Sequence, residues 1–394
     1  MFDVVIVGGG MVGASLALKF SQAGLKVALL EKTAPVPLSP TAAVDLRVSA
    51  INRRSEAWLD SLGAWSLLPP ERLCPYQRLQ AFEVAAGRQA LFGPAELTFT
   101  AAEISQPHLG HIVENQQLQA ALWQALPATV QICCPATVLS LQQGVDSSAV
   151  QTAEFGEIRG RLLIAADGGQ SQLRSLAGIG CHGWQYQQAC LVATVQTAYG
   201  QQDITWQQFT EQGPRAFLPL PGAQASLVWY DDVYKVQQLA KLPPQELAQQ
   251  IRQHFPAKLG EIKLQQQGWF ALTRMHANQY YAGRVVLVGD AAHTINPLAG
   301  QGVNLGFADA MLLAELVLAA IGKGQDPADA TLLASYQRQR KAANLLMMSA
   351  MDSFYQVFKS NWPLLRLARQ TGLALAAKAG PLKAWVGAYA AGLK

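Results

Sequence analysis

Apolar and polar positions follow one another in blocks that predict a nucleotide-binding β–α–β unit at the start of the chain. Residues 4–7 form a short apolar run, which is typical of a buried parallel strand. Residues 14–20 have helical character, Gly24 ends that helix, and residues 27–30 form a second apolar run. The pattern therefore predicts a strand, a helix and a strand within residues 3–32.

Later blocks predict further units of the same kind and then a β-rich stretch. Residues 111–126 predict a strand that enters an amphipathic helix, and residues 161–178 predict a strand, a turn and a helix start. Residues 186–270 are β-rich and are interrupted by one helix near 244–255. A helical pattern fills residues 330–394, so we expect an α/β protein with a second, mainly antiparallel part.

Composition changes this picture in two ways. The 394 residues suit two domains, and the charged fraction of 14% lies below the roughly 25% of typical soluble domains. We therefore expect an unusual apolar surface or apolar cavity. The net charge of +4 gives no case for nucleic acid as a partner, because nucleic-acid binding needs clustered basic residues.

Targeting and metal signals are not expected. No apolar stretch of about 18 residues lacks a charge or a helix breaker, so we predict no transmembrane helix. The chain enters a strand at Phe2 without the basic segment of a signal peptide. The five cysteines have no metal-binding spacing, which favours free thiols in a reducing cytosol and no metal site.

A glycine motif lies between the first strand and the first helix. Gly8 permits the tight turn, Gly10 lets the backbone approach a pyrophosphate, and Gly13 lets the helix pack on the strand. The helix N-terminus supplies amide donors for the anion. Glu31, at the end of the second strand, can accept hydrogen bonds from ribose hydroxyls, which favours NAD or FAD over NADP.

Two further polar segments follow predicted strands. Asp167 and Gly168 end one apolar run, and Gly289-Asp290 end another. The second is followed by a glycine-rich segment, residues 295–302, and then by a helical pattern. Such a turn between a buried strand and a helix predicts a polar ligand that needs close backbone approach.

The three segments in their order resemble the FAD-dependent aromatic hydroxylases of the para-hydroxybenzoate hydroxylase type. They are GGGMVG with Glu31, ADGGQSQLR at 166–174, and GDAAHTINPLAGQG at 289–302. The longer stretch GDAAHTINPLAGQGVNLG is similar to the ubiquinone-biosynthesis hydroxylases within that group. Within that resemblance, the segments WQYQQACLVATVQ, TWQQFTEQGPRAFLPL and SLVWYD are expected to separate members that act at different ring carbons.

The resemblance implies FAD as the cofactor and a set of residues that contact it. Asp290 is expected at the ribityl chain and pyrophosphate, and Pro297 close to the isoalloxazine ring. A helix N-terminus after Gly300 would stabilise negative charge on reduced flavin. The implied contacts are Gly8, Gly10, Val12, Gly13, Glu31, Arg47, Asp167, Gly168, Asp290, Pro297, Gly300, Gln301, Gly302 and Asn304.

The implied reaction is hydroxylation of the aromatic ring of a polyprenyl benzoquinol through a flavin C4a-hydroperoxide. O2 is then the co-substrate, and an external donor such as NAD(P)H supplies the electrons. Three alternatives stay open: a sibling hydroxylase of the same pathway acting at another ring carbon, a flavin reductase or epoxidase acting on an isoprenoid, and an FAD-binding scaffold of the biosynthetic complex.

The catalytic group is not identified by the sequence. The candidates are Arg47, His293 and Pro297, with a surface salt bridge as the alternative for Arg47 and structural packing as the alternative for His293. Aromatic and proline residues of the β-rich stretch are candidates for the substrate pocket, although alternating aromatics are also typical of plain core. These residues are Trp206, Phe209, Pro214, Phe217, Pro219 and Trp229.

The expected architecture is a doubly wound, Rossmann-like FAD-binding domain with an inserted, mainly antiparallel β substrate domain and a helical C-terminal tail. We assign residues 1–72, 101–180 and 272–330 to the first, 73–100 and 181–271 to the second, and 331–394 to the tail. The tail packs on its own domain or a second subunit, or contacts a membrane or partner. A cytoplasmic location, peripheral to the inner membrane, fits a lipid substrate, and other ubiquinone-biosynthesis proteins and a homo-oligomer are further candidate partners.

Overall fold

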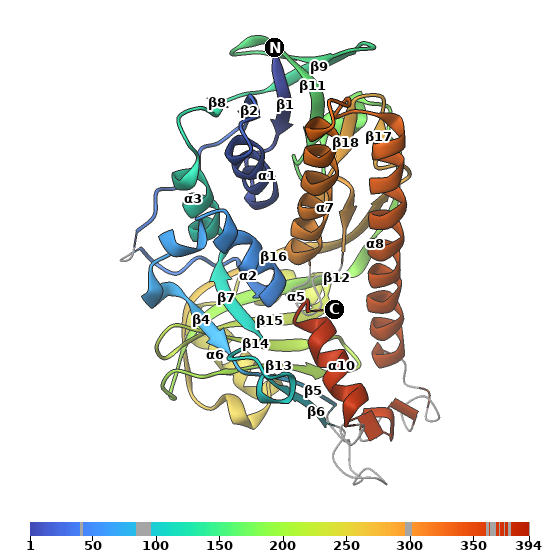
Figure 1. The fold of residues 1–394 in the computed structure, drawn as a ribbon. Coiled ribbons are helices and arrows are strands. Elements are labelled where there is room, and N and C mark those ends of the chain that lie inside the picture. The colour runs from blue at the N-terminus through green and yellow to red at the C-terminus, as the bar shows by residue number, and fades with distance from the viewer. Residues whose placement is uncertain are drawn as a thin grey trace.

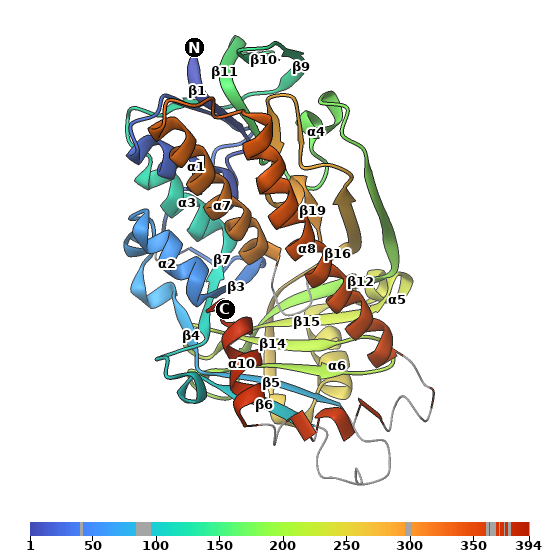
Figure 2. The same cartoon turned by 45° about the vertical axis from the view of Figure 1, so that its right-hand side comes forward.

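The computed structural model describes residues 1–39, 42–83, 96–295, 302–359, 362, 368–369, 371–373, 375–376 and 380–393. Within these residues the chain forms three β-sheets with helices on their faces (Figure 1). Strands β1 (Phe2–Val7), β2 (Val27–Leu30) and β11 (Gly156–Ala165) lie at one end of the molecule with helix α1 (Met11–Gln22), and the second eight-stranded sheet lies at the other end. Helix α8 (Ala330–Lys359) runs alongside α7 (Gly302–Gly322) and extends toward the second sheet (Figure 2).

The first sheet is parallel at its centre, as the glycine-punctuated apolar runs predict. Its main order is β17-β18-β11-β1-β2-β8, and β9 and β10 extend it from β11. β1 pairs in parallel with both β2 and β11, and its inner residues are fully buried, as expected of a central parallel strand. The strands are β1 (Phe2–Val7), β2 (Val27–Leu30), β8 (Gln131–Cys133), β9 (Val138–Gln143), β10 (Ser148–Thr152), β11 (Gly156–Ala165), β17 (Tyr281–Ala282) and β18 (Val285–Leu287).

Helices cover this sheet and share its core. They are α1 (Met11–Gln22), α3 (Asn115–Ala125), α4 (Gln172–Leu176), α7 (Gly302–Gly322) and α8 (Ala330–Lys359). α7 is long and apolar enough to cross a membrane by length and composition alone. Its apolar side chains belong to the main core, and the helix contacts α1 and α8, so it is a core helix of this fold.

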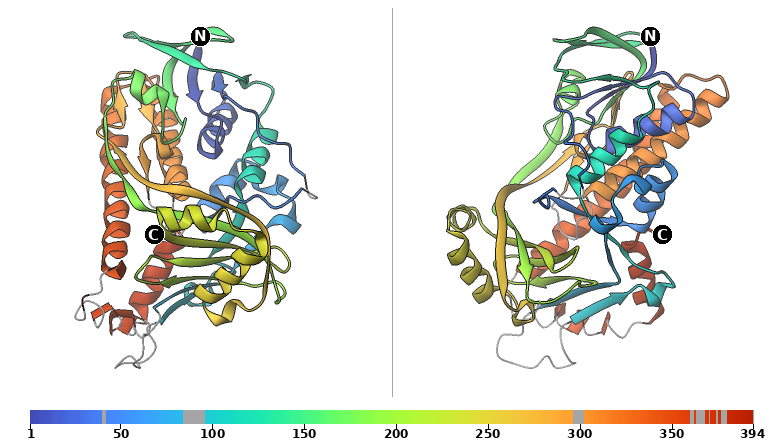
Figure 3. Two further views of the ribbon diagram at one scale, coloured as in Figure 1. Left: turned by 180° about the vertical axis from the view of Figure 1, so that it is seen from behind. Right: turned by 90° about the vertical axis from the view of Figure 1, so that its left-hand side faces the viewer.

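The second sheet has the order β19-β16-β12-β15-β14-β13-β5-β6 and is antiparallel except where β13 pairs with β5. Its strands are β5 (Arg78–Glu83), β6 (Glu96–Thr100), β12 (Cys181–Thr197), β13 (Ile204–Phe209), β14 (Arg215–Leu220), β15 (Gln224–Asp232), β16 (Ile262–Ala277) and β19 (His293–Thr294). Helices α5 (Val233–Leu239) and α6 (Pro244–His254) cover one face, and α10 (Pro381–Ala390) lies on the other side (Figure 3).

A small third sheet, β3-β7-β4, connects the two parts. Its strands are β3 (Val48–Asn52), β4 (Cys74–Tyr76) and β7 (Gly110–Glu114), and α2 (Arg53–Ser61) follows β3 directly. The side chain of Asn52 caps α2 by accepting a hydrogen bond from the amide of Ser55. Asn52 also pairs with Gly110 of β7, so α2 begins beside β7.

The α/β class with a parallel sheet, an antiparallel insert and C-terminal helices is confirmed. The expected domain boundaries stay a prediction, although two elements bear on them. The boundary at 271/272 falls inside β16, which pairs with β12 over nearly its whole length. In the expected tail, Tyr336 of α8 donates a hydrogen bond to the carbonyl of Leu287, so α8 packs on the first sheet.

Candidate active site

The glycine turn between β1 and α1 leaves no room for side chains at two positions. Gly8 has a φ of 106°, and a Cβ on it would lie 2.3 Å from the carbonyl oxygen of Ala166. A Cβ on Gly13 would lie 1.9 Å from the carbonyl oxygen of Gly8. At Gly10, by contrast, a Cβ would meet nothing within 4 Å, so open space lies beside the backbone at the start of α1.

Glu31 is oriented toward this turn by backbone amides. Its Oε2 accepts from the amide of Gly9 at 2.6 Å, and its Oε1 accepts from the amides of Lys32 and Thr33 at 2.8 and 3.2 Å. The carboxylate is therefore held in one place at the carboxyl end of β2. That is the position from which an acid can contact a ribose in this class of fold.

A pocket of about 290 Å³ opens at the carboxyl ends of β1, β2 and β11. Its lining residues come from all three strand ends and from the segment after β8: Val7, Gly8, Gly10, Leu30, Glu31, Lys32, Ala136, Val138, Ala166, Asp167, Gly168, Gln170 and Gln172. The pocket combines open space at Gly10, a helix N-terminus and a fixed carboxylate, which suits the adenosine and pyrophosphate end of FAD. Gly8, Gly10, Glu31, Asp167 and Gly168 are thus brought together.

The second motif is a capped turn. Asp167 accepts from the hydroxyl of Ser171 at 2.5 Å and from the amide of Leu173 at 3.1 Å, so its carboxylate fixes the start of α4. Gly168 has a φ of 82°, which favours glycine. Asp167 and Gly168 are therefore accounted for by the shape of this loop as well as by a bound ligand.

Arg174 connects the second motif, residues 166–174, to the third motif, residues 289–302. Its guanidinium is buried and donates to the carbonyl of Ala291 at 2.8 Å and to the carbonyl of Gly169 at 3.0 Å. A single side chain therefore joins the two loops. The two motifs lie side by side although more than a hundred residues separate them along the chain.

The third motif places Asp290 facing outward from a short turn at residues 289–291. Solvent reaches the Asp290 side chain, yet protein surrounds it densely, and this burial raises its pKa while His293 and Arg47 oppose the rise. Arg47 is exposed and acts on Asp290 from the loop before β3. That position favours a place for Arg47 near the third motif over an isolated surface salt bridge. The role of Arg47 stays a prediction.

The remaining third-motif candidates divide into two groups. Pro297, Gly300 and Gln301 lie outside the described residues. Gly302 begins α7, as expected for a helix that follows the turn. Asn304 is buried, donates to the carbonyl of Ala50 at 2.8 Å and accepts from the amide of Asn52 at 3.1 Å, so it anchors α7 on β3.

Val12 lies where α1 crosses α7. A Cβ on Gly306 would come within 2.7 Å of its Cγ2, and one on Gly289 within 3.4 Å. Val12 therefore packs against the backbone of the third motif. A direct contact between Val12 and FAD stays a prediction.

His293 is held in a buried network that sequence reasoning missed. Its Nε2 lies 2.6 Å from Oδ2 of Asp309, which also accepts from the amide of Gly289 at 3.0 Å. The other oxygen, Oδ1, accepts from Arg340 at 2.6 Å and from Asn344 at 3.1 Å. Burial raises the pKa of Asp309, but its ion pairs outweigh burial and lower the pKa to about 2.

The network continues away from the third motif. Asn344 donates to the hydroxyl of Tyr280 at 3.1 Å, and that hydroxyl lies 3.0 Å from Nε2 of His276. Burial lowers the pKa of His276 to about 4, so the ring is neutral at pH 7. With 1% of its side chain exposed, His293 serves this network, which favours structural packing over the role of a general base. The available sequence signal was Asp309, one of two acidic residues, with Glu315, in the mostly apolar helix α7.

The six pocket candidates of the second sheet do not share one face. Trp206, Phe217 and Trp229 are at most 3% exposed and pack against α6 through Phe255. Phe209 faces the other way and contacts Phe358 of α8, with ring centroids 4.2 Å apart. The positions of Trp206, Phe217 and Trp229 favour plain core for these three residues.

Both prolines among the candidates are buried. Pro214 precedes β14, and its carbonyl accepts from the amide of Tyr230. Pro219 lies within β14, two residues after Phe217 and therefore on the same face of the sheet. A substrate role for Phe209, Pro214 and Pro219 stays a prediction.

Known proteins resemble this chain over most of its length. Residues 1–350 match the family described as FAD binding domain. The chain is 44% identical over 393 residues to the 3-demethoxyubiquinol 3-hydroxylase of Escherichia coli, covering 99% of this chain and 98% of that protein. It is 35% identical over 385 residues to ubiquinone hydroxylase UbiL of Rhodospirillum rubrum, covering 97% and 87%. The solved structure of p-nitrophenol 4-monooxygenase from Pseudomonas putida DLL-E4 has the same fold, with a TM-score of 0.76 and 22% identity over 97% of this chain and 95% of that one.

Proposed function

This chain belongs to the FAD-binding ubiquinone hydroxylase family, and we propose that it hydroxylates the last open ring carbon of a 2-polyprenyl-3-methyl-6-methoxy-1,4-benzoquinol. The observation that carries the proposal is the 44% identity, over nearly the full length of both chains, to a 3-demethoxyubiquinol 3-hydroxylase. Identity to ubiquinone hydroxylase UbiL is lower, at 35%. The enzyme is an FAD-dependent aromatic hydroxylase.

The residues of the first sheet would bind the cofactor. Gly10 and the N-terminus of α1 would hold the pyrophosphate, and Glu31 the ribose of the adenosine. When bound, the flavin supplies the redox chemistry that activates O2. The N-terminus of α7, beginning at Gly302, would stabilise negative charge at the pyrimidine end. The electrons would come from an external donor, with NAD(P)H as the proposed reductant.

The second sheet would hold the ring over the flavin. On the face opposite α6, Leu218 and Val228 are half-buried and apolar, and Val228 packs with Tyr230 and with Leu46, the neighbour of Arg47. We place the ring between this face and the third motif. An apolar wall here would exclude water and orient an electron-rich ring, and the polyprenyl tail would extend along it.

The C-terminal helix would bring the enzyme to its lipid substrate. α10 is fixed to its own chain, because Lys383 pairs with Glu103 at 2.6 Å, yet Trp385 and Tyr389 are exposed and stack on each other. Aromatic side chains of this kind favour the membrane interface. We propose a cytoplasmic enzyme that contacts the inner membrane peripherally. Other ubiquinone-biosynthesis proteins and a second copy of the chain are further proposed partners.

The test is aerobic turnover of the purified flavoprotein under 18O2. A reductant and a short-tailed 3-methyl-6-methoxy-benzoquinol are supplied, and the product is analysed by mass spectrometry. We expect a product that carries one additional oxygen-18 atom. Turnover under ordinary O2 in 18O-labelled water is the control and should leave the added oxygen unlabelled.

Two other results would redirect the proposal. Labelling of an earlier ring intermediate, but not of this quinol, would assign the chain to a sibling step. Bound FAD that is reduced normally, with no labelled ring product, would favour a scaffold. The variant Val228→Trp should impair hydroxylation and keep FAD bound, whereas Val145→Trp, at a position 88% exposed, should leave turnover unchanged.

A further inference from the structure

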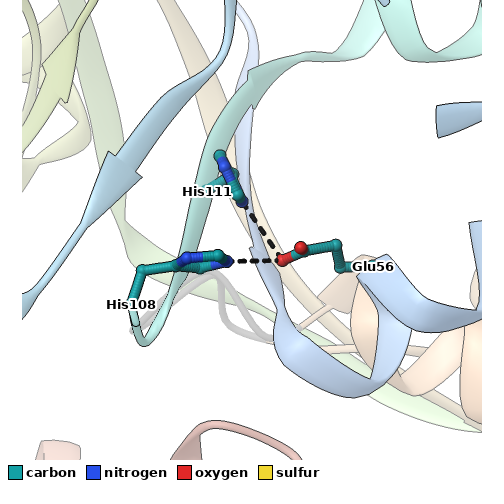
Figure 4. Close-up of side chains that lie close together, drawn as sticks. All are labelled: Glu56, His108 and His111. Carbon is teal, nitrogen blue, oxygen red and sulfur yellow. Dashed lines mark hydrogen bonds and ion pairs between the residues drawn. The ribbon is translucent and has the colours of Figure 1, made fainter. Parts of the chain in front are cut away.

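A second group of polar side chains lies outside the FAD pocket, between α2 and β7. Glu56 stands in the first turn of α2, His111 in β7, and His108 in the loop that leads into β7. The three side chains point toward one another (Figure 4). One atom of each, a carboxylate oxygen or a ring nitrogen, lies within 4.8 Å of the other two.

The hydrogen bonds of this group conflict at one atom. Nε2 of His108 lies 2.6 Å from Nη1 of Arg53, which can only donate, and 2.9 Å from Oε2 of Glu56, which can only accept. A ring nitrogen carries either a proton or a lone pair, so Nε2 can satisfy only one of these neighbours. A cation in place of the Arg53 nitrogen would accept the lone pairs of Glu56 and His108 together.

We propose that Glu56, His108 and His111 form a binding site for a divalent transition-metal ion of the zinc class. Two imidazole nitrogens and one carboxylate are ligands that Zn²⁺ binds, with a fourth position left for water. Mg²⁺ and Ca²⁺ prefer sites built from oxygen. Oε2 of Glu56 already lies 3.1 Å from Nδ1 of His111, so only small side-chain movements are needed to surround one ion.

The surrounding elements fix the ligands but leave an entrance. The ring of His111 is held edge-on by Trp65, with centroids 5.2 Å apart, and Glu56 is fixed by the capped start of α2. Glu56 and His108 remain 14% and 15% exposed, and Arg53 is 23% exposed. Solvent therefore reaches all three of these side chains.

Arg53 and the metal ion compete for the same carboxylate. Nη1 of Arg53 lies 2.6 Å from Oε1 of Glu56, so the guanidinium must turn outward when the ion binds. This movement need not disturb the backbone of Arg53, because its amide donates to the carbonyl of Ala391, the residue that follows α10. Removal of the Arg53 charge should accordingly strengthen metal binding. In a simple ion-pair cluster, the same change would instead remove a stabilising partner of Glu56.

The test uses the purified holoenzyme after removal of metals by chelation. Zn²⁺ binding is measured by equilibrium dialysis with elemental analysis, and Co²⁺ is added as a second probe whose absorption lies at longer wavelengths than that of oxidised flavin. We expect one ion per chain. His108→Ala and His111→Ala should each weaken binding at least about tenfold, and Arg53→Met should tighten it.

Controls separate this site from incidental binding. His182→Ala removes an exposed histidine beside the exposed Cys181 and should leave the stoichiometry at the Glu56 site unchanged. Flavin content and circular dichroism verify that each variant is folded. The proposal is overturned if the wild-type enzyme binds no Zn²⁺ in the micromolar range, or if His108→Ala binds it as tightly as wild type. It is also overturned if Arg53→Met weakens binding.

Discussion

Asp309 and Glu56 each stand on a helix and each contact histidine, but the two carboxylates have different surroundings. Asp309 is fully buried, and both of its oxygens accept from donors on other elements. Glu56 is 14% exposed, and its neighbour His108 has two contacts that cannot both be satisfied. The first group is closed and complete, and the second is open and incomplete.

The difference separates a structural cluster from one able to bind a ligand. A buried charge is tolerated when every lone pair has a donor, and such a network then fixes the elements that supply the donors. The Asp309 group fixes the third motif through Gly289 and His293. An incomplete group at the surface retains the freedom to exchange one partner for another.

The largest effect is expected from Asp309→Asn, which breaks the closed group. The charge of Arg340 would then stay buried without its carboxylate, and we expect a loss of about 3–5 kcal/mol in the free energy of unfolding. Urea denaturation followed by circular dichroism measures the loss. Asp60→Asn, at an exposed position of α2, is the control and should change stability by less than about 0.5 kcal/mol. A loss below about 1 kcal/mol for Asp309→Asn would contradict the assignment of a coupled network.

A smaller loss of stability is expected when the pH is lowered. It separates His276 from Asp309 within the buried network, because the two side chains titrate at different pH. Burial lowers the pKa of His276 from 6.5 to about 4, so the folded state favours the neutral ring. The neutral ring of His276 therefore contributes about 2–3 kcal/mol to the free energy of unfolding above pH 6.5. This contribution is lost as the pH falls toward 4. His276→Gln should lack this slope in urea midpoints measured across that range, whereas His182→Gln should retain it.

Asp309 titrates in a separate window. Its pKa is lowered from 3.8 to about 2, so its contribution is lost only as the pH falls below about 4. Stability lost between pH 6.5 and 4 in the His276→Gln variant would therefore have to come from another group, and would contradict the assignment of that slope to His276.

The smallest effect is expected from Glu56→Gln in the open group. Glutamine keeps one acceptor oxygen and removes a charge that solvent partly screens, so we expect a loss of about 1 kcal/mol. The same urea titration without added metal measures it. A loss as large as that of Asp309→Asn would show that the two groups do not differ in the way their burial indicates.

Sequence reasoning predicted the parts of this molecule that depend on local geometry. Gly8 and Gly13 are required by contacts within a single strand–turn–helix unit, so their spacing alone predicts them. The Asp309 network depends on Arg340 and Asn344, which stand on a different helix and carry no periodic signal. Such a network becomes visible only once α7 and α8 are packed together.

The aromatic residues of the second sheet show a different limit. Trp206 and Phe209 both lie in β13 and both are buried, because helices cover the sheet on each side. Alternation along a strand separates two faces, but it does not tell which face meets a substrate when both are covered. Val228 and Leu218, less conspicuous in the sequence, occupy the face opposite α6.

The parallel pairing of β5 with β13 affects how the chain folds during its synthesis on the ribosome. Arg78 pairs with Ile204 and Glu83 with Phe209, so β5 leaves the ribosome well before its partner strand. At about 5–20 residues per second, this interval is on the order of ten seconds. During that time the edge of β5 that later pairs with β13 is unpaired, and an unpaired edge is a site of aggregation. We therefore expect the yield of folded enzyme to depend on chaperones that shield a nascent chain.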